Sequence, residues 1–193
     1  EAFRTLVDYF SQCDEPTLIV MFGDHQPSVE QEFLDLAYGV TQSEMTMEQY
    51  MGKYCVPFVI WANYPLPEEG PEVTSLNFLG QYVLRYAGLQ GNGYDSFLWQ
   101  LQTRLPAITF VGYVDRTGKA YSHLETNEFT ACIEDYQRIQ YNNLFGGERR
   151  QSQLFALPEE QASAQPVKAA GRKPQGGGIC LSLSCHRPRG RGN

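Results

Sequence analysis

The chain has 193 residues, of which 42% are hydrophobic and 13% aromatic, so it is long enough and apolar enough to fold around a core. Its net charge of -7 is unevenly distributed, because residues 1–155 hold nine basic and twenty acidic side chains and residues 156–193 hold six and two. An acidic body argues against nucleic acid as a partner, and no apolar stretch reaches the roughly 18 to 20 residues of a membrane-spanning helix. The five cysteines are widely spaced and do not suggest a disulfide framework.

The first expected elements are a helix and a buried strand. Residues 2–12 place apolar side chains at helical spacing. Residues 17–22 contain five apolar residues in six, with no polar alternation, which predicts a fully buried core strand. Gly23 then allows the backbone to turn, and Pro27 prevents further ladder pairing.

Asp24 and His25 are therefore expected just past the carboxyl end of a core strand, where open α/β sheets bind their ligands. A carboxylate oxygen beside an imidazole nitrogen suits Mn²⁺, Zn²⁺ or another divalent cation. The structural alternative is an Asx turn that carries a half-buried, hydrogen-bonded histidine.

Helical patterns and a second apolar strand follow this step. Ser28 is a plausible N-cap for a helix that ends at Gly39, and residues 44–53 predict a shorter helix. Residues 56–61 are all apolar and predict a second core strand, with Pro57 at or near its beginning.

The rest of the body is predicted to contain helices and one hairpin. We expect a loop over 64–74, helices over 75–87, 94–104 and 128–141, and a hairpin with strands 108–114 and 119–122. The first of these helices is expected to bury Leu76, Leu79, Val83, Leu84 and Ala87.

Residues 156–193 form a basic tail rich in Gly, Pro and Arg, and the sequence predicts that this tail is disordered. Cys180, Cys185 and His186 do not match the spacing of a zinc site well. In the body, His123 lies beside Ser122 and Glu125, but no nucleophile-elbow motif surrounds a serine, so a surface histidine is expected.

Residues 22–27 (Phe-Gly-Asp-His-Gln-Pro) resemble the metal-binding Asp-His step of the sulfatase and alkaline phosphatase superfamily. Segments 56–63, 76–89 and 136–145 resemble, in the same order, its lipoteichoic acid synthase (phosphoglycerol transferase) branch. The resemblance covers about residues 1–155. It implies an α/β fold, namely the C-terminal portion of an alkaline-phosphatase-like α/β/α sandwich with a small β-hairpin and a C-terminal helix.

The resemblance implies that Asp24 and His25 bind one divalent metal ion, with Mn²⁺ first and Mg²⁺ or Zn²⁺ as alternatives. Gln26 and Asn63 are candidates to hold the imidazole or a phosphate oxygen. Members of this branch carry a threonine nucleophile and a metal-binding glutamate far upstream of the Asp-His step, so no catalytic nucleophile is expected within this chain. We therefore expect the C-terminal part of a larger enzyme, inactive by itself.

The expected function is that of a metal-dependent phosphotransferase or hydrolase for phosphoglycerol-type or related phosphate or sulfate esters at the cell envelope. The implied partner is a phosphate- or sulfate-ester lipid or glycan, and the transferred group stays open among phosphoglycerol, phosphoethanolamine and sulfate. The parent is expected to be a bacterial membrane-anchored protein with an extracytoplasmic catalytic domain, and this portion to be soluble. The alternative is a non-catalytic α/β interaction module with a structural Asp-His turn.

Overall fold

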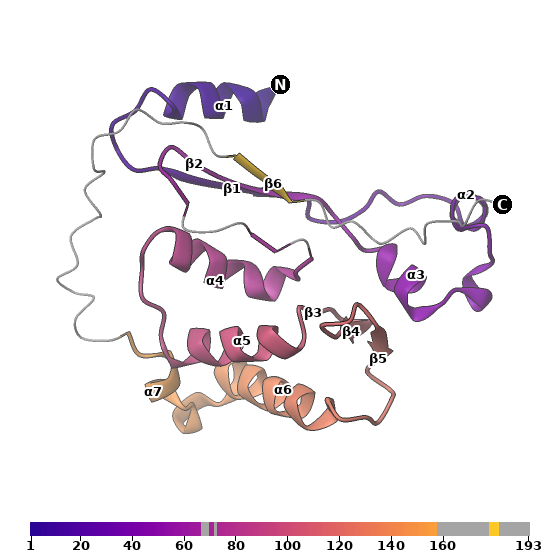
Figure 1. Ribbon diagram of the computed structural model, residues 1–193. Coiled ribbons are helices and arrows are strands. Elements are labelled where there is room, and N and C mark those ends of the chain that lie inside the picture. The colour runs from indigo at the N-terminus through magenta and orange to yellow at the C-terminus, as the bar shows by residue number, and fades with distance from the viewer. Residues whose placement is uncertain (67–69, 72, 158–177, 182–193) are drawn as a thin grey trace. The chain divides into compact units, whose positions relative to one another are not determined.

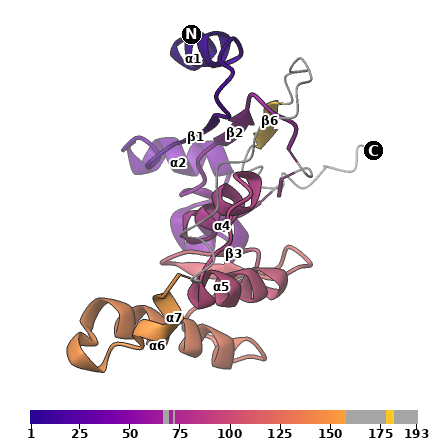
Figure 2. The same ribbon diagram turned by 90° about the vertical axis from the view of Figure 1, so that its left-hand side faces the viewer.

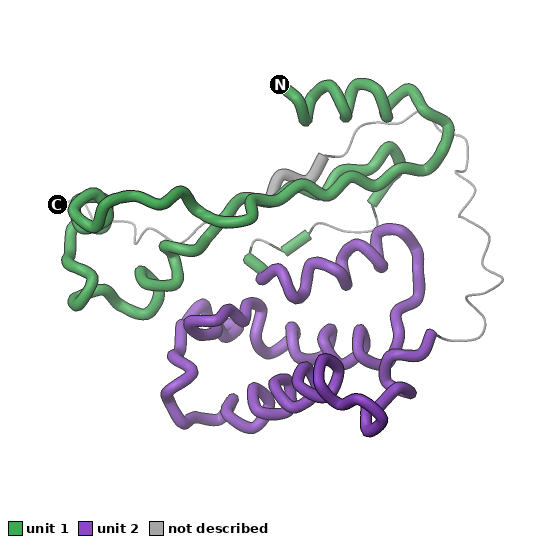
Figure 3. The backbone as a smooth tube through the Cα atoms, turned by 180° about the vertical axis from the view of Figure 1, so that it is seen from behind, with its two compact units in different colours: residues 1–74, 166–193 green, residues 75–165 purple. Residues whose placement is uncertain are grey.

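The computed structural model describes residues 1–66, 70–71, 73–157 and 178–181 (Figure 1). The chain divides into two compact units, residues 1–74 with 166–193 and residues 75–165 (Figure 3). Each unit combines helices with one small antiparallel sheet, so the predicted mixed α/β class is confirmed. Residues 1–155 are expected from the sequence to form one portion, and the boundary between the two units, at residues 74 and 75, falls inside it.

The first unit is built on a three-stranded sheet with the order β1-β2-β6. Its described elements are α1 (Ala2–Phe10), β1 (Leu18–Phe22), α2 (Gln31–Tyr38), the 3-10 turn η1 (Gln42–Glu44), α3 (Met47–Gly52), β2 (Phe58–Ala62) and β6 (Gly178–Leu181). The segment that holds α2 and α3 connects the end of β1 to the beginning of β2 (Figure 1).

Strands β1 and β2 are adjacent, as their two apolar runs predict, and they are antiparallel. Leu18 is opposite Ala62, and Phe22 is opposite Phe58. Pro57 lies directly before β2, because a residue without an N–H suits the start of a strand. The antiparallel register places the end of β1 beside the beginning of β2, and the end of β2 beside the beginning of β1.

Strand β1 is less buried than its sequence predicts. Its first three residues are half-buried, and Met21 and Phe22 are each 46% exposed. In contrast, four of the five residues of β2 are buried, and Ile60 is completely buried. The physical reason is position, since β2 has a strand on either side while β1 is the outer strand of the described sheet.

Strand β6 lies in the tail that the sequence predicts to be disordered. Gly178–Leu181 pairs antiparallel with β2, with Leu181 opposite Phe58. The backbone groups on the second side of β2 offer a template for such pairing, which composition does not reveal. The remaining residues after 157, including Cys185 and His186, lie outside the described residues.

The second unit contains helices, which Figure 2 shows from another side, and a small meander with the order β3-β4-β5, whose strands are labelled in Figure 1. Its elements are α4 (Leu76–Tyr86), α5 (Gly93–Arg104), β3 (Ala107–Ile108), β4 (Gly112–Val114), β5 (Ala120–Ser122), α6 (Thr130–Phe145), the 3-10 turn η2 (Gly147–Arg149) and α7 (Ser152–Phe155). Its core cluster consists of Phe78, Leu98, Leu101, Leu105, Ile108, Tyr113, Ile133 and Tyr136.

Two expectations for this unit are wrong in detail. Helix α4 buries Leu79 as expected, but it also buries an aromatic stripe, Phe78, Tyr82 and Tyr86, and it leaves Leu76 51% exposed, because both sides of the helix carry apolar residues. The single strand expected over 108–114 is split into β3 and β4. A tight turn at Thr109 separates them, since its Oγ1 accepts hydrogen bonds from the N–H groups of Val111 and Gly112.

Candidate metal centre

The candidate site begins where β1 leaves the sheet. The N–H of Gly23 donates to the carbonyl oxygen of Pro57 at 3.0 Å, next to the last β1–β2 pair. A Cβ at position 23 would lie 2.9 Å from Cβ of Val56, so a glycine is needed for this close approach. The chain therefore remains in contact with the segment before β2 as far as Gly23, and Asp24 is the first residue beyond the β1–β2 hydrogen-bond ladder.

The carboxylate of Asp24 and the imidazole of His25 lie together beyond the strand end. Oδ2 of Asp24 is 3.5 Å from Nε2 of His25, while Oδ1 accepts a hydrogen bond from the backbone N–H of His25 at 2.9 Å. Nδ1 of His25 is 2.8 Å from the carbonyl oxygen of Gln26. A carbonyl can only accept, so Nδ1 carries the proton in this contact and the neutral ring keeps its lone pair on Nε2.

These two atoms fit a shared divalent cation. Two ligand atoms bound at about 2.1 Å in a tetrahedral arrangement are about 3.4 Å apart, close to the observed separation. The contact between Nδ1 and a backbone carbonyl is also the usual outer support of a metal-binding histidine. Oxygen and nitrogen donors of this kind suit Mn²⁺, Zn²⁺ or Mg²⁺ rather than a soft metal.

Gln26 holds the turn that carries the pair. Its side-chain Nε2 donates to the carbonyl oxygen of Cys55, just before β2. The backbone carbonyl of Gln26, and not its side chain, supports the imidazole. The sequence singles out Gln26, but its partner Cys55 was not predicted, because only the antiparallel register brings residue 55 beside residue 26.

Asn63 lies at the opposite end of the β1–β2 pair from Asp24 and His25. Its Oδ1 accepts from the N–H of Thr17 at 2.8 Å, and its Nδ2 donates to the carbonyl oxygens of Phe10, Cys13 and Glu15 at 2.9 to 3.1 Å. These bonds tie α1 to the start of β1. The structure therefore does not bring Asn63 together with the Asp-His pair.

The pair is open to solvent. The side chains of His25 and Asp24 are 77% and 86% exposed. Within the part of the chain that the structure describes, no group of three or more His, Cys, Asp and Glu side chains is placed to hold a metal. Asp24 and His25 are thus a pair of ligand-type side chains, and the described residues place no third one beside them.

His123 is not the surface histidine that the sequence predicts. It is half-buried, with Nε2 2.7 Å from the carbonyl oxygen of Thr109, and its ring centroid lies 5.5 Å from that of Tyr113. The carboxylate of Glu125 accepts from the backbone N–H of Ser122, so it does not extend a charge relay through the histidine. His123 therefore joins the turn at Thr109 to the segment after β5.

Asp115 forms a second polar cluster, and this cluster is structural. Its carboxylate accepts hydrogen bonds from both the N–H and the hydroxyl of Thr117, from the N–H of Lys119 and from the hydroxyl of Tyr121. Burial raises the pKa of Asp115, but the hydrogen bonds together outweigh burial and lower the pKa. The same contact with Asp115 raises the pKa of Tyr121 to about 12. These bonds close the β4–β5 turn.

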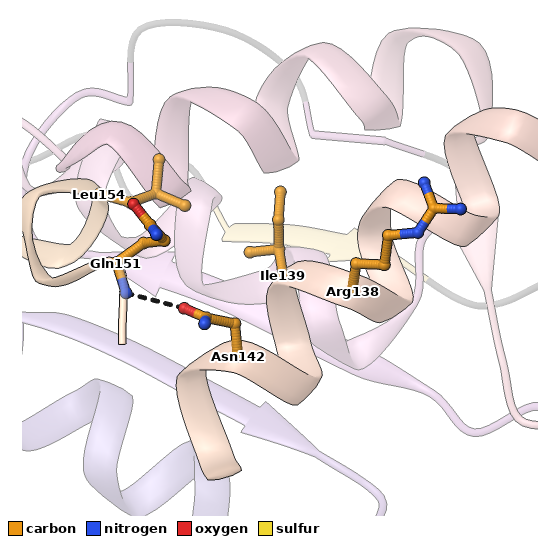
Figure 4. Close-up of a pocket in the computed structure, with 5 residues that line it drawn as sticks. All are labelled: Arg138, Ile139, Asn142, Gln151 and Leu154. Atoms are coloured by element: carbon orange, nitrogen blue, oxygen red, sulfur yellow. Dashed lines mark hydrogen bonds between the residues drawn. The ribbon is translucent and has the colours of Figure 1, made fainter. Parts of the chain in front are cut away.

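Figure 4 shows a hollow between α6 and the residues that follow it, about 300 Å³ in volume and lined by Arg138, Ile139, Asn142, Gln151 and Leu154. The guanidinium of Arg138 is held by Glu134 and Asp135, each at 2.9 Å. The lining contains no carboxylate, histidine or nucleophile, so this hollow offers no catalytic chemistry.

The comparisons with known proteins give a family match for the region that contains the Asp-His step. A family model described as Sulfatase matches residues 1–89. A curated protein of Rhizobium meliloti (strain 1021), named "Putative cyclic beta-1,2-glucan modification protein", is 25% identical over 168 residues. These residues are 85% of this chain and 26% of the relative, so the chain spans about a quarter of that protein's length.

No solved structure matches the chain. No helix of the described residues is long and apolar enough to cross a membrane. The Sulfatase match contains β1, the Asp-His step, β2 and α4, and the relative extends the similarity over most of the body. The Sulfatase match over residues 1–89 and the similarity to this relative together support the sulfatase and alkaline phosphatase superfamily for this chain.

Proposed function

We propose that this chain is the C-terminal part of a metal-dependent, sulfatase-like phosphotransferase or hydrolase, and that Asp24 and His25 bind one divalent cation, with Mn²⁺ preferred. The observation that carries the proposal is the 3.5 Å separation between Oδ2 of Asp24 and Nε2 of His25, inside the region that matches the Sulfatase model. Because Nδ1 donates to the carbonyl oxygen of Gln26, the lone pair on Nε2 is available to bind a cation together with Asp24.

Each residue of the turn has a separate task. Asp24 supplies negative charge that offsets the charge of the cation, and His25 supplies a directional nitrogen. The carbonyl of Gln26 holds the proton on Nδ1, while its side chain fixes the turn against Cys55. When bound, the metal acts as a Lewis acid that stabilises charge on a phosphoryl or sulfuryl oxygen and activates a hydroxyl nucleophile. We expect that nucleophile, a threonine in the branch that the sequence resembles, to lie outside these 193 residues.

The proposed substrates are phosphoglycerol-type or related phosphate or sulfate esters carried by an envelope lipid or glycan. The similarity to a protein whose name describes glucan modification supports a glycan acceptor. The resemblance to the phosphoglycerol transferase branch supports a phosphodiester donor. We further propose that the whole protein is anchored in a bacterial membrane with its catalytic domain outside the cytoplasm, and that nucleic acid is not a partner, since the body is acidic.

The test compares the present chain with a protein extended upstream in the same reading frame. Turnover of a phosphoglycerol lipid and of an aryl sulfate is measured in Mn²⁺ and after chelation. The extended protein should turn over at least one ester in Mn²⁺ only, and the present chain should turn over neither, because two ligands without a nucleophile cannot complete the reaction.

Substitutions in the extended protein assign the ligands. Asp24→Asn or His25→Ala should lower turnover by at least about 100-fold, in line with loss of a direct metal ligand. The matched controls Asp14→Asn and His123→Gln replace the same residue types elsewhere and should retain turnover. If Asp24→Asn and His25→Ala leave both turnover and Mn²⁺ binding unchanged, the Asp-His turn is structural and the interaction-module alternative stands.

A further inference from the structure

Asn92 and Gly93 form the one Asn-Gly step in the 193 residues. Asn92 is the N-cap of α5, and Gly93 is the first residue of that helix. A side-chain amide followed by glycine is prone to cyclise, because glycine has no side chain to keep its backbone nitrogen away from Cγ of the asparagine. The step lies in the second unit, whereas Asp24 and His25 belong to the first.

The folded chain holds the side-chain amide of Asn92 at both ends. Oδ1 accepts a hydrogen bond from the N–H of Asp95 at 3.0 Å, and Nδ2 donates to the carbonyl oxygen of Phe155 at 3.4 Å. The N–H of Asn92 donates in return to the carboxylate of Asp95 at 2.8 Å, which completes a capping box. Cyclisation requires Cγ to turn toward the nitrogen of Gly93, and this rotation breaks both side-chain bonds.

Helix α7 covers the same step. A Cβ at position 93 would lie 3.1 Å from Cδ1 and 3.2 Å from the carbonyl oxygen of Leu154, so Leu154 packs directly on Gly93. The ring of Phe155 packs on that of Tyr94, with 5.2 Å between centroids, and the guanidinium of Arg150 lies 4.7 Å from the centroid of Phe155. Because α7 has only four residues, we expect it to open locally more often than α5 unfolds.

We propose that Asn92 is a site of spontaneous deamidation and that α7 is the shield that sets its rate. When α7 opens, the backbone nitrogen of Gly93 bonds to Cγ of Asn92, the bond from Cγ to Nδ2 breaks, and ammonia leaves with the proton of the Gly93 amide. Water then opens the cyclic imide at either carbonyl and leaves aspartate or isoaspartate at position 92. The product cannot donate to Phe155 and places a negative charge beside Asp95, so the modification weakens the docking of α7.

Timed incubation of the full chain in mildly alkaline buffer tests the proposal. Mass spectrometry follows the tryptic peptide 86–104, in which Asn92 is the only asparagine. The folded wild type should convert at least about 100-fold more slowly than the chain unfolded in guanidinium chloride, where α7 and the cap are both lost. Phe155→Ala should convert about tenfold faster than the wild type, because α7 then opens more often. The matched control Phe155→Tyr keeps a ring against Tyr94 and Arg150 and should convert at the wild-type rate.

Two further variants complete the experiment. Asn92→Ser keeps a capping side chain and should abolish the conversion, which assigns it to residue 92. Circular dichroism during heating checks that Phe155→Ala still unfolds cooperatively. If it does not, Arg150→Ala replaces it, since this variant removes only the guanidinium from the ring of Phe155 and should also accelerate conversion.

The outcomes bear on the shield and on the site separately. Equal rates in the folded and the unfolded wild type overturn the shield, and so does a folded Phe155→Ala that converts no faster than Phe155→Tyr. An unfolded chain in which peptide 86–104 keeps its amide overturns the site itself. None of these measurements depends on a bound metal or on turnover, so they stand or fall independently of the proposed function.

Discussion

Asn63 is a hydrogen-bonding centre for the beginning of β1, because its one side chain satisfies the N–H of Thr17 and three backbone carbonyls. Asn63→Ala should lower the free energy of unfolding by about 1 to 3 kcal/mol, since half-buried backbone groups then lose their partners. Denaturant unfolding measures the loss.

Mn²⁺ binding at Asp24 and His25 is the second measurement for Asn63→Ala, and it should be unchanged, because Asn63 lies at the other end of the β1–β2 pair. The second variant Asn63→Asp keeps an acceptor for Thr17 but places a carboxylate oxygen against the three carbonyl oxygens, so it should destabilise the protein at least as much as Asn63→Ala. A variant that keeps its stability but loses Mn²⁺ binding would show that Asn63 does support the metal.

At the scale of elements, the exit from β1 depends on the close approach of Gly23 to Val56. A Cβ at position 23 would be 2.9 Å from Cβ and 3.3 Å from Cγ1 of Val56. Gly23→Ala should destabilise the protein by about 1 to 3 kcal/mol and displace the Asp-His turn, because the strand end must move away.

A double-mutant cycle identifies the cause of the Gly23→Ala effect. Val56→Gly removes all three side-chain atoms that the new Cβ would meet, so Gly23→Ala should cost less in that background than in the wild type. Urea unfolding gives the coupling free energy. Purely additive losses would mean that backbone conformation, and not this contact, requires glycine at position 23.

Most of the elements could be predicted from the sequence, although strand β6 and the division between β3 and β4 could not. The apolar runs locate β1 and β2, Pro57 marks the start of β2, and the predicted stop at Gly39 coincides with left-handed backbone at φ 71°. Such signals depend only on neighbouring residues in the sequence, so they can be recognised without knowing which elements pack against one another.

The relations between elements could not be predicted. The direction of β2 relative to β1 depends on the intervening chain, and this direction separates Asn63 from Asp24. The burial of β1 depends on which strands flank it, and the buried face of α4 depends on what packs against a helix that is apolar on more than one side. Asp24 and His25 were predictable as neighbours because they are consecutive, and the support from Cys55 was not, because it crosses the ladder.

For the whole molecule, the division into two units has a consequence for folding. All eight members of the core cluster lie between Phe78 and Tyr136, within the second unit. We therefore expect residues 75–157 to fold cooperatively when produced alone, since a core of their own is present. Circular dichroism during heating measures this.

Leu105→Ala provides the internal comparison for that experiment. Leu105 is completely buried in the cluster, so the substitution should cost about 2 to 5 kcal/mol. The loss should be similar in residues 75–157 and in the whole chain if the second unit is autonomous. A shortened chain that shows no cooperative melting would contradict autonomy.

The two proposed ligands are adjacent in the chain, and this adjacency sets an order of assembly. The entropy lost on closing a loop grows with the logarithm of its length, so two consecutive residues meet without a long loop to close. The contact between His25 and the carbonyl oxygen of Gln26 is local, whereas a ligand from a distant segment must wait for its own loop to close. On the proposed assignment, the Asp-His turn is the first part of the metal centre to form, and the later ligands assemble around a half-site that already has its geometry.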